Sequence, residues 1–517
     1  MSTRTLWTGP VAVLAAASMT VCIASARADV VTEWNETYLD VTRVTGGAPC
    51  PISRAGPMFT LAMFDAINAI DRANGAAGFE AYQQGLPAPA AGISREAAGA
   101  AAAYTAMASL HASNAPAMAL IQARYDAQLA GIATGAAKTA GIAFGQSVAH
   151  GLLALRANDG YDGDPSYTQG GNAGDWRITP DGPFVQPFTP HWGNVVPWGL
   201  PSGSYFRPTT LTDFGSMSSL MRSAAYAEQI NGSAAVPGVK ALGARVSATR
   251  TADETEAAWF WANDRDGTSK PPGQLIQITL VLSQQFNLSL SENAHLFGLV
   301  GLGLGDACVA AWDAKYNTEI DLWRPISAIR ETVDDGNTLT NPDPAWLPLN
   351  DFTPPFPAYV SGHATFGAVH AAIMRRYFGT DNITFAVGSD EFGANPGLGY
   401  PANLTRTFTS FSQAAWENAM SRVWLGVHFY WDSLDGNILG DRVGNYAFSH
   451  YLRPVAACDP DVNEDGSIDA ADVDFLVNVI AGGANPLEMN PDFNRDGNAD
   501  QGDIDAMINA IAGGGCP

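Results

Sequence analysis

Small and apolar residues recur at helical spacing in several long segments of the chain. From Ala91 to Leu155 the sequence is rich in alanine, and Leu, Ile, Met and Tyr return at intervals that fit one face of a helix. The same pattern holds from Glu254 to Ala262 and from Leu275 to Trp312. These segments predict a body that is mostly α-helical.

Two further segments break this pattern. Between about Asn158 and Thr212 the chain is rich in Gly, Pro and Trp without a clear period, which predicts a long ordered loop packed by aromatic side chains. After Tyr451 the helical pattern ends, and from Cys458 onward thirteen acidic residues face one basic residue, Arg495. We therefore expect a body over residues 29–455 and a separate acidic module over residues 456–517.

The first residues have the features of an export signal. Arg4 precedes an apolar run from Val11 to Ala24, and the small residues Ala26 and Ala28 follow, which predicts a signal peptide over residues 1–28 with cleavage after Ala28. A membrane anchor is the alternative, but the run is shorter than the ~20 residues that a span needs. We expect a soluble mature protein that is secreted or periplasmic, with no later membrane span.

Charge and cysteine content narrow the choice of partners and compartment. The net charge of −24 becomes −26 without Arg4 and Arg27, which argues against nucleic acid and anionic lipid as partners. Of five cysteines, Cys22 leaves with the signal. Cys458 and Cys516 bracket the acidic module and are expected to pair, whereas Cys50 and Cys308 either pair or stay as buried thiols.

The acidic module contains a repeat with the spacing of calcium-binding loops. Two segments align at an offset of 31 residues, each with oxygen-bearing residues at loop positions 1, 3, 5, 9 and 12, a carbonyl at 7 and Gly466 or Gly497 at 6. An acidic solvated tail is the alternative, but it does not explain two copies in register. The predicted ligands of two Ca²⁺ ions are Asp461, Asn463, Asp465, Ser467 (carbonyl), Asp469 and Asp472, then Asp492, Asn494, Asp496, Asn498 (carbonyl), Asp500 and Asp503.

Position 12 of each loop is Asp rather than Glu, and no helix precedes the first loop. Both features resemble the type I dockerin module over nearly all of the tail. The resemblance implies a small α-helical module that folds around calcium and binds a cohesin-like protein.

Two segments of the body predict a site for a tetrahedral oxyanion. Ser361, Gly362 and His363 stand at the start of a strong helical pattern, where free amides and the helix dipole favour an anion. Arg422, His428 and Asp432 supply a cation, an imidazole and a carboxylate that orients the imidazole. Each segment alone also fits a structural role at a helix start or in the core.

The spacing within the second segment predicts a break in the helix. His428 and Asp432 are four residues apart, so one helical turn stacks them. Arg422 and His428 are six apart, about 240° around an ideal helix, so a break near Gly426 must bring them together. Lys315 and Arg324 add two cations, although a solvated helix face would also explain that pair.

The ordered co-occurrence of these groups in a chain with eight histidines resembles the vanadium-dependent haloperoxidases, which share fold and pocket with the type 2 acid phosphatases. The resemblance implies an all-α helical-bundle core with long loops. It implies that Lys315, Arg324, Ser361, the Gly362 amide and Arg422 bind vanadate, that His428 ligates vanadium, and that His363 is the acid-base residue. Asp264 would pair with the pocket arginine, and Asp432 would support His428.

One spacing departs from the commonest family pattern. Eight residues separate Lys315 from Arg324 instead of six, which rotates the two cations about half a turn apart unless a helix end intervenes. Lys315 is the member of the set that this departure puts in doubt.

The resemblance implies oxidation of halide by hydrogen peroxide to hypohalous acid, which halogenates an organic acceptor. Trp312 and Phe356 stand where the chloroperoxidase-like branch has the aromatics of its halide pocket, although core packing would also explain them. An exported acid phosphatase with a phosphohistidine intermediate is the enzymatic alternative. A docking protein whose body has lost activity is the non-catalytic one.

Overall fold

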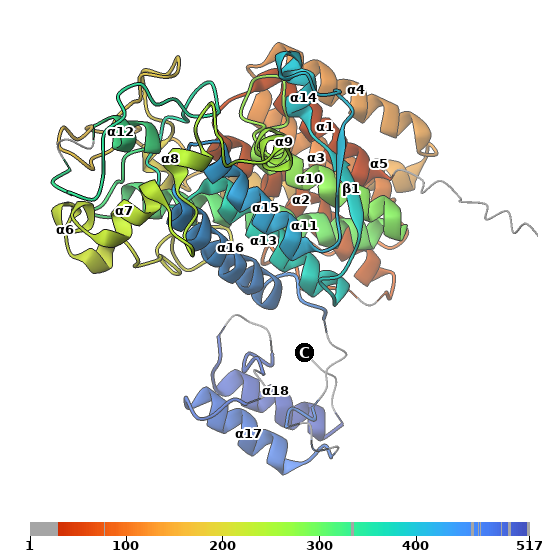
Figure 1. Ribbon diagram of the computed structural model, residues 1–517. Helices are drawn as coiled ribbons and strands as arrows, with labels where there is room; N and C mark the ends of the chain where they lie inside the picture. The colour runs from red at the N-terminus through yellow and green to blue at the C-terminus, as the bar shows by residue number, and fades with distance from the viewer. Residues whose placement is uncertain are drawn as a thin grey trace, which may run out of the picture.

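The computed structural model describes residues 29–76, 78–331, 335–455, 460–463, 465, 467–486, 489–494 and 498–513. The predicted signal peptide, the predicted Cys458–Cys516 pair and the predicted calcium ligand Asp496 lie outside the described residues. The described chain is mostly helical, as expected, and α17 and α18 form a module that Figure 1 draws apart from the body.

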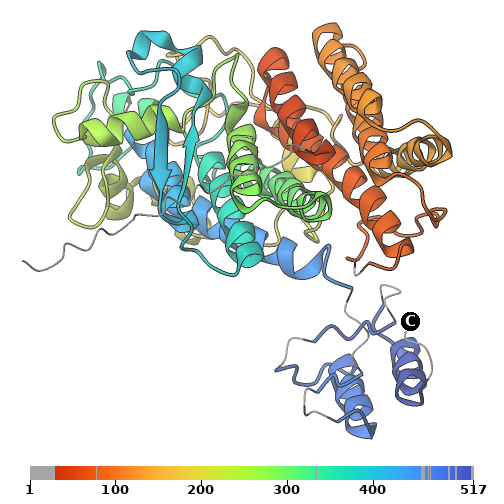
Figure 2. The same ribbon diagram turned by 90° about the vertical axis from the view of Figure 1, so that its right-hand side faces the viewer.

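Five helices form the N-terminal part of the body, seen in red to orange in Figure 2. Small residues allow close packing here: a Cβ on Gly145 of α5 would lie 2.0 Å from the Ala98 carbonyl oxygen of α3. The alanine-rich composition of this region therefore serves helix contact. The helices are α1 (Val30–Thr45), α2 (Pro49–Ala73), α3 (Arg95–His111), α4 (Ala115–Gly131) and α5 (Ala136–Leu155).

The second group of helices carries the candidate site. α11 lies in the core, packed against α2 on one side and against α13 and α16 on another. The helices of this group are α9 (Ala252–Phe260), α10 (Lys270–Phe286), α11 (Leu290–Tyr316), α13 (Gly362–Phe378), α15 (Phe411–Trp424) and α16 (Tyr430–His450).

A row of glycines brings α16 close to α13. Gly436, Gly440 and Gly444 recur every fourth residue on α16, and a Cβ on Gly440 would lie 2.2 Å from the Thr365 carbonyl oxygen of α13. The amide of Ser361 donates to the Asp432 carbonyl at 2.9 Å. The first turns of α13 and α16 therefore lie side by side.

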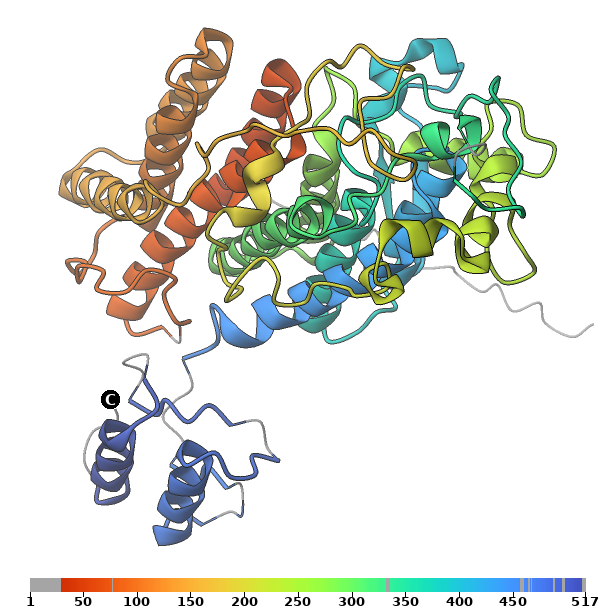
Figure 3. The same ribbon diagram turned by 90° about the vertical axis from the view of Figure 1, so that its left-hand side faces the viewer.

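The long loop expected before Thr212 is present and is packed by buried tryptophans, Trp176, Trp192 and Trp198. The loop contains η1 (Pro190–Asn194). Beyond it, four short helices and their loops cover one side of the body, on the left in Figure 1 and on the right in Figure 3: α6 (Met217–Met221), α7 (Ala224–Asn231), α8 (Val239–Leu242) and α12 (Pro325–Arg330). The other short elements are η2 (Thr212–Phe214), α14 (Asp390–Ala394), η4 (Pro396–Leu398) and the antiparallel pair β1 (Phe385–Gly388) and β2 (Thr405–Phe408).

The expectation that no later segment is long and apolar enough for a membrane span is wrong on length and composition. Among the described residues, α11 passes that test, with a mean hydropathy of 1.5 over its most apolar stretch. That stretch is wholly buried inside the body. A helix surrounded by protein on all sides is apolar all round, which explains the composition of α11.

The C-terminal module contains α17 (Ala470–Ile480) and α18 (Gln501–Ile511), each following one predicted calcium loop. The two loops repeat one hydrogen bond: the Asn463 amide donates to Asp472, and the Asn494 amide donates to Asp503. Among the described residues, no group of three or more His, Cys, Asp or Glu side chains is gathered for a metal ion. The two calcium sites therefore stay a prediction.

Candidate active site

A break between α15 and α16 brings Arg422 and His428 together. α15 ends at Trp424, and Gly426 adopts a φ of 83°, where a Cβ would lie 2.4 Å from the Gly243 carbonyl oxygen. Only glycine fits this position without moving the neighbouring chain. The break predicted from the six-residue spacing is therefore present.

His428 is held by a carboxylate from the first turn of α16. Its Nδ1 lies 3.0 Å from Asp432 Oδ2, and the same oxygen accepts the Phe429 amide at 3.0 Å. Burial, and then the charge of Arg324, lowers the pKa of His428 well below its usual value. The imidazole is therefore neutral near pH 7, and Nε2, 3.1 Å from Arg324 Nη1, is the nitrogen on the anion side.

Two buried guanidinium groups converge beside His428. Arg324 donates to the carbonyls of Phe356 at 2.7 Å and Val427 at 2.6 Å, and Arg422 donates to Asp264 at 2.8 Å. Arg324 Nη2 and both Nε and Nη1 of Arg422 have no hydrogen-bond partner among the described residues. Buried donors almost always have partners, so three unpaired guanidinium nitrogens, which together carry five N–H bonds, indicate an anion site.

Lys315 reaches the same place because a helix end intervenes before Arg324. α11 ends at Tyr316, and Arg324 is the N-cap residue of α12, so the two cations do not share a helix face. The ammonium group of Lys315 donates to the carbonyls of Pro357, Ala358 and Val360. These bonds use all three of its donors, so Lys315 fixes the segment before Ser361. Burial, and then the charge of Arg324, lowers the pKa of Lys315, whereas its three carbonyl acceptors favour the protonated amine.

The start of α13 supplies the remaining groups. Ser361 is the N-cap residue of α13, and Gly362 is the first helical residue. His363 Nε2 lies 3.0 Å from the Ala262 carbonyl oxygen and 4.0 Å from Asp264 Oδ2. Burial, and then the charge of Arg422, lowers the pKa of His363 to about 4. Every candidate residue of the body site therefore lies in one region of the structure.

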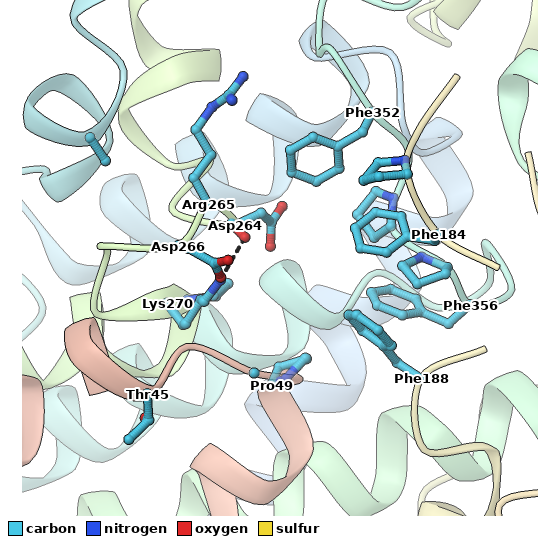
Figure 4. A pocket seen from close by; sticks show the side chains of 16 residues that line it. Thr45, Pro49, Phe184, Phe188, Asp264, Arg265, Asp266, Lys270, Phe352 and Phe356 are labelled. Carbon is cyan, nitrogen blue, oxygen red and sulfur yellow. Dashed lines mark hydrogen bonds and ion pairs between the residues drawn. The ribbon is translucent and has the colours of Figure 1, made fainter. Parts of the chain in front are cut away.

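A pocket of about 640 Å³ opens onto this region, because Asp264 and Phe356 are among its lining residues. Figure 4 shows two facing walls. The apolar wall contains Phe184, Phe188, Phe352 and Phe356, and the charged wall contains Asp264, Arg265, Asp266 and Lys270.

Only one of the two aromatics expected at the pocket lines it. The ring of Trp312 is fully buried and lies 4.9 Å from the ring of Phe356, which does line the pocket. Trp312 therefore supports Phe356 from behind, and its indole N–H donates to the Phe188 carbonyl at 3.2 Å.

Sequence reasoning missed most of the charged wall. Lys270 is buried, has a φ of 61° and donates to the Asp264 carbonyl at 2.8 Å, so it fixes the loop that presents Asp264 to Arg422. The two prolines that follow Lys270 are a local signal for a helix start, but nothing in the sequence connects that start to the site.

Sulfate, which keeps its two negative charges through the weakly acidic range, tests the charge of His363. A bound dianion raises the pKa of the nearby imidazole above 4, so binding takes up a proton. We expect sulfate affinity to rise as pH falls from 6.5 toward 4, measured by titration calorimetry. His363→Gln should flatten this dependence, and a flat profile in the unsubstituted protein would contradict the assignment.

The body and the C-terminal module each match a known protein family model. Residues 295–457 match the model of the VCPO second helical-bundle domain, and residues 459–512 match the dockerin type I domain. The vanadium chloroperoxidase of Curvularia inaequalis is 31% identical over 301 residues, which are 49% of this chain and 47% of that protein. The chain thus spans about half the length of this curated relative.

Solved structures share the fold over most of the body. A bacterial vanadium-dependent iodoperoxidase superposes with a TM-score of 0.66 at 21% identity, covering 82% of this chain and 97% of its own. A holo-type bacterial vanadium-dependent chloroperoxidase gives 0.57 at 18% identity, covering 78% and 93%. The helical fold and the resemblance to a vanadium haloperoxidase with a dockerin-like tail are confirmed.

Proposed function

We propose that this protein uses vanadate to oxidise a halide with hydrogen peroxide, releasing hypohalous acid that halogenates an organic acceptor. The observation that carries the proposal is the set of three unpaired guanidinium nitrogens beside the neutral imidazole of His428. The 31% identity to a vanadium chloroperoxidase favours this chemistry over phosphate-ester hydrolysis.

The donor set fits a tetrahedral oxyanion. Arg324 and Arg422 would bind its oxygens through their unpaired N–H groups, and the start of α13 adds the Ser361 hydroxyl and the Gly362 amide. His428 would supply the nitrogen ligand through Nε2. When bound, vanadate would supply a Lewis-acid centre that activates hydrogen peroxide toward attack by halide.

The protein's own groups would hold charge and move protons around that centre. Lys315 places a positive charge near the segment before Ser361, which favours electron withdrawal from the bound oxygens. His363 has a pKa of about 4 and is neutral at working pH, so it can accept a proton from an incoming peroxide and later return it to a leaving oxygen. Asp264 accepts a hydrogen bond from Arg422 and lies near His363, so it holds these two side chains in fixed positions relative to each other.

The apolar wall favours a weakly hydrated reactant in front of the anion site. The pocket faces of Phe352 and Phe356 exclude water, and halide ions lose hydration more easily than a phosphate ester does. An organic acceptor would fit in the wider part of the pocket. This wall is the feature that separates the proposal from the acid phosphatase alternative.

The experiment compares both chemistries in one preparation. Purified protein is incubated with orthovanadate, and bromination of a dye by hydrogen peroxide is assayed beside hydrolysis of an aryl phosphate without vanadate. Vanadate-dependent bromination supports the proposal. Hydrolysis without bromination would replace it with the phosphatase, and neither activity would favour the docking protein.

For the C-terminal module we propose two calcium sites and docking to a cohesin-like protein. The match to the dockerin type I domain and the repeated bond between loop positions 3 and 12 support this proposal. Asp472 and Asp503 are fully buried, so a bound cation would offset the cost of two buried carboxylates. Export through the signal at residues 1–28 would bring the module to a calcium-rich compartment.

Calcium removal is expected to unfold the module and leave the body intact. With a chelator, protease should cut within residues 460–513 while the body resists, because α17 and α18 alone bury too little apolar surface. Calorimetry should give two calcium ions per chain. Asp472→Ala should remove one, whereas replacement of the exposed Asp474 by alanine should remove neither; an unchanged protease pattern would contradict the prediction.

A further inference from the structure

A pair of cysteines lies directly behind the anion site. Cys50, in the first turn of α2, and Cys308, in α11, are both fully buried, and their Sγ atoms lie 2.8 Å apart. Both carry free thiols in this structure. The Cys308 thiol is placed to donate to the sulfur of Cys50.

The position of the pair connects it to the functional face of α11. Cys308, Trp312 and Lys315 are spaced by four and then three residues, so they lie along one face of that helix. Trp312 supports Phe356, and Lys315 holds the segment that leads to Ser361. A constraint at Cys308 therefore acts on the row of side chains that shapes the site.

Cys50 lies close to residues that line the pocket. Pro49, the neighbour of Cys50, lines the pocket, as Figure 4 shows. Cys50 also lies beside the hydroxyl of Thr189, whose neighbour Phe188 belongs to the apolar wall. The two sulfurs thus stand between the pocket wall on α2 and the anion-binding face of α11.

We propose that Cys50 and Cys308 are an oxidation site at which hydrogen peroxide forms a disulfide that joins α2 to α11 behind the anion site. Each thiol loses one proton and one electron, the S–S bond forms, the O–O bond of the peroxide breaks, and two water molecules leave. The first oxidation gives a sulfenic acid, and the second thiol displaces its hydroxyl group.

The contact also protects the sulfurs from further oxidation. A lone cysteine in a peroxide-using protein advances from the sulfenic to the sulfinic acid, which is irreversible in most proteins. Here the second sulfur is already in contact with the first, so closure of the disulfide competes with attack by a second peroxide. Burial raises the pKa of Cys50, so the reaction is expected late in folding, when the two sulfurs are already in contact but solvent and peroxide still reach them.

The test uses the full chain, refolded from the reduced state with calcium and hydrogen peroxide. After denaturation and alkylation without reductant, peptide mapping should find Cys50 linked to Cys308. Free alkylated Cys50 and Cys308, or linkage of either residue to Cys458 or Cys516, would overturn the proposal. This outcome does not depend on vanadate or on halide oxidation, so it separates the proposal from the proposed function.

Cysteine variants test whether the disulfide protects Cys50 from over-oxidation and whether it stabilises the body. In Cys308→Ala, peroxide should add oxygen atoms to Cys50, because the closing thiol is missing; unmodified Cys50 would argue against the protective role. Reduction of the linked protein should lower its melting temperature by about 5–10 °C, because the link closes a long loop in the unfolded chain. The Cys50→Ala/Cys308→Ala protein should show no effect of reductant on the body transition.

Discussion

Replacement of His428 by alanine is expected to lower vanadate-dependent halide oxidation by about 10³-fold or more, because it removes the imidazole nitrogen that lies 3.1 Å from Arg324 Nη1, beside the unpaired guanidinium nitrogens. Anion binding by the arginines should survive in weakened form. The measurements are bromination kinetics with saturating peroxide and the affinity for orthovanadate.

A histidine far from the pocket provides the control. His150 is exposed on α5, and alanine there should leave activity and vanadate affinity unchanged. The His428→Ala protein should keep the circular dichroism of the parent, because Asp432 still accepts the Phe429 amide and the chain break at Gly426 does not depend on the imidazole. If it brominates at the parent rate, His428 is not the vanadium ligand.

Replacement of Lys315 by methionine is expected to affect stability as strongly as activity. The substitution leaves three carbonyls, those of Pro357, Ala358 and Val360, without their donor inside the core. A buried carbonyl left without a donor costs about 1–3 kcal/mol, so the free energy of unfolding should fall by about 3 kcal/mol or more. Denaturant unfolding of the body measures the change.

Lys240 offers the comparison for that experiment. It donates to the Asn341 carbonyl at the surface, so methionine there should change the free energy of unfolding by less than about 1 kcal/mol. A Lys315→Met protein with normal stability but no vanadate binding would show that the ammonium group serves the anion directly and that its carbonyl bonds are secondary.

The anion site could be predicted because local rules fix its parts. Ser361 caps a helix, Gly426 breaks one, and Asp432 stands one turn after His428, so sequence spacing alone positions these groups within their segments. How the segments meet depends on long-range packing. The role of Lys315 was open for this reason: only the end of α11 at Tyr316 and the return of the chain to Arg324 settle where its ammonium group lies.

The pocket walls could not be predicted in the same way. Phe184 and Phe188 belong to a segment without a period, and their direction is set by packing against distant residues such as Phe352. Lys270 depends on an unusual backbone angle that propensity does not reveal. For α11 the apolar composition was informative about burial, but hydropathy alone does not distinguish a core helix from a membrane helix.

The glycine row on α16 sets the distance between α13 and α16, and that distance fixes the geometry of the anion site. Because His428 precedes α16 and Ser361 caps α13, each tenth of an ångström added between these helices widens the gap between the vanadium ligand and the oxyanion donors. Glycines that touch no reactant therefore set the distance between the groups that bind the anion. Sequence variation along Gly436, Gly440 and Gly444 should be as tightly limited as variation in the ligands themselves.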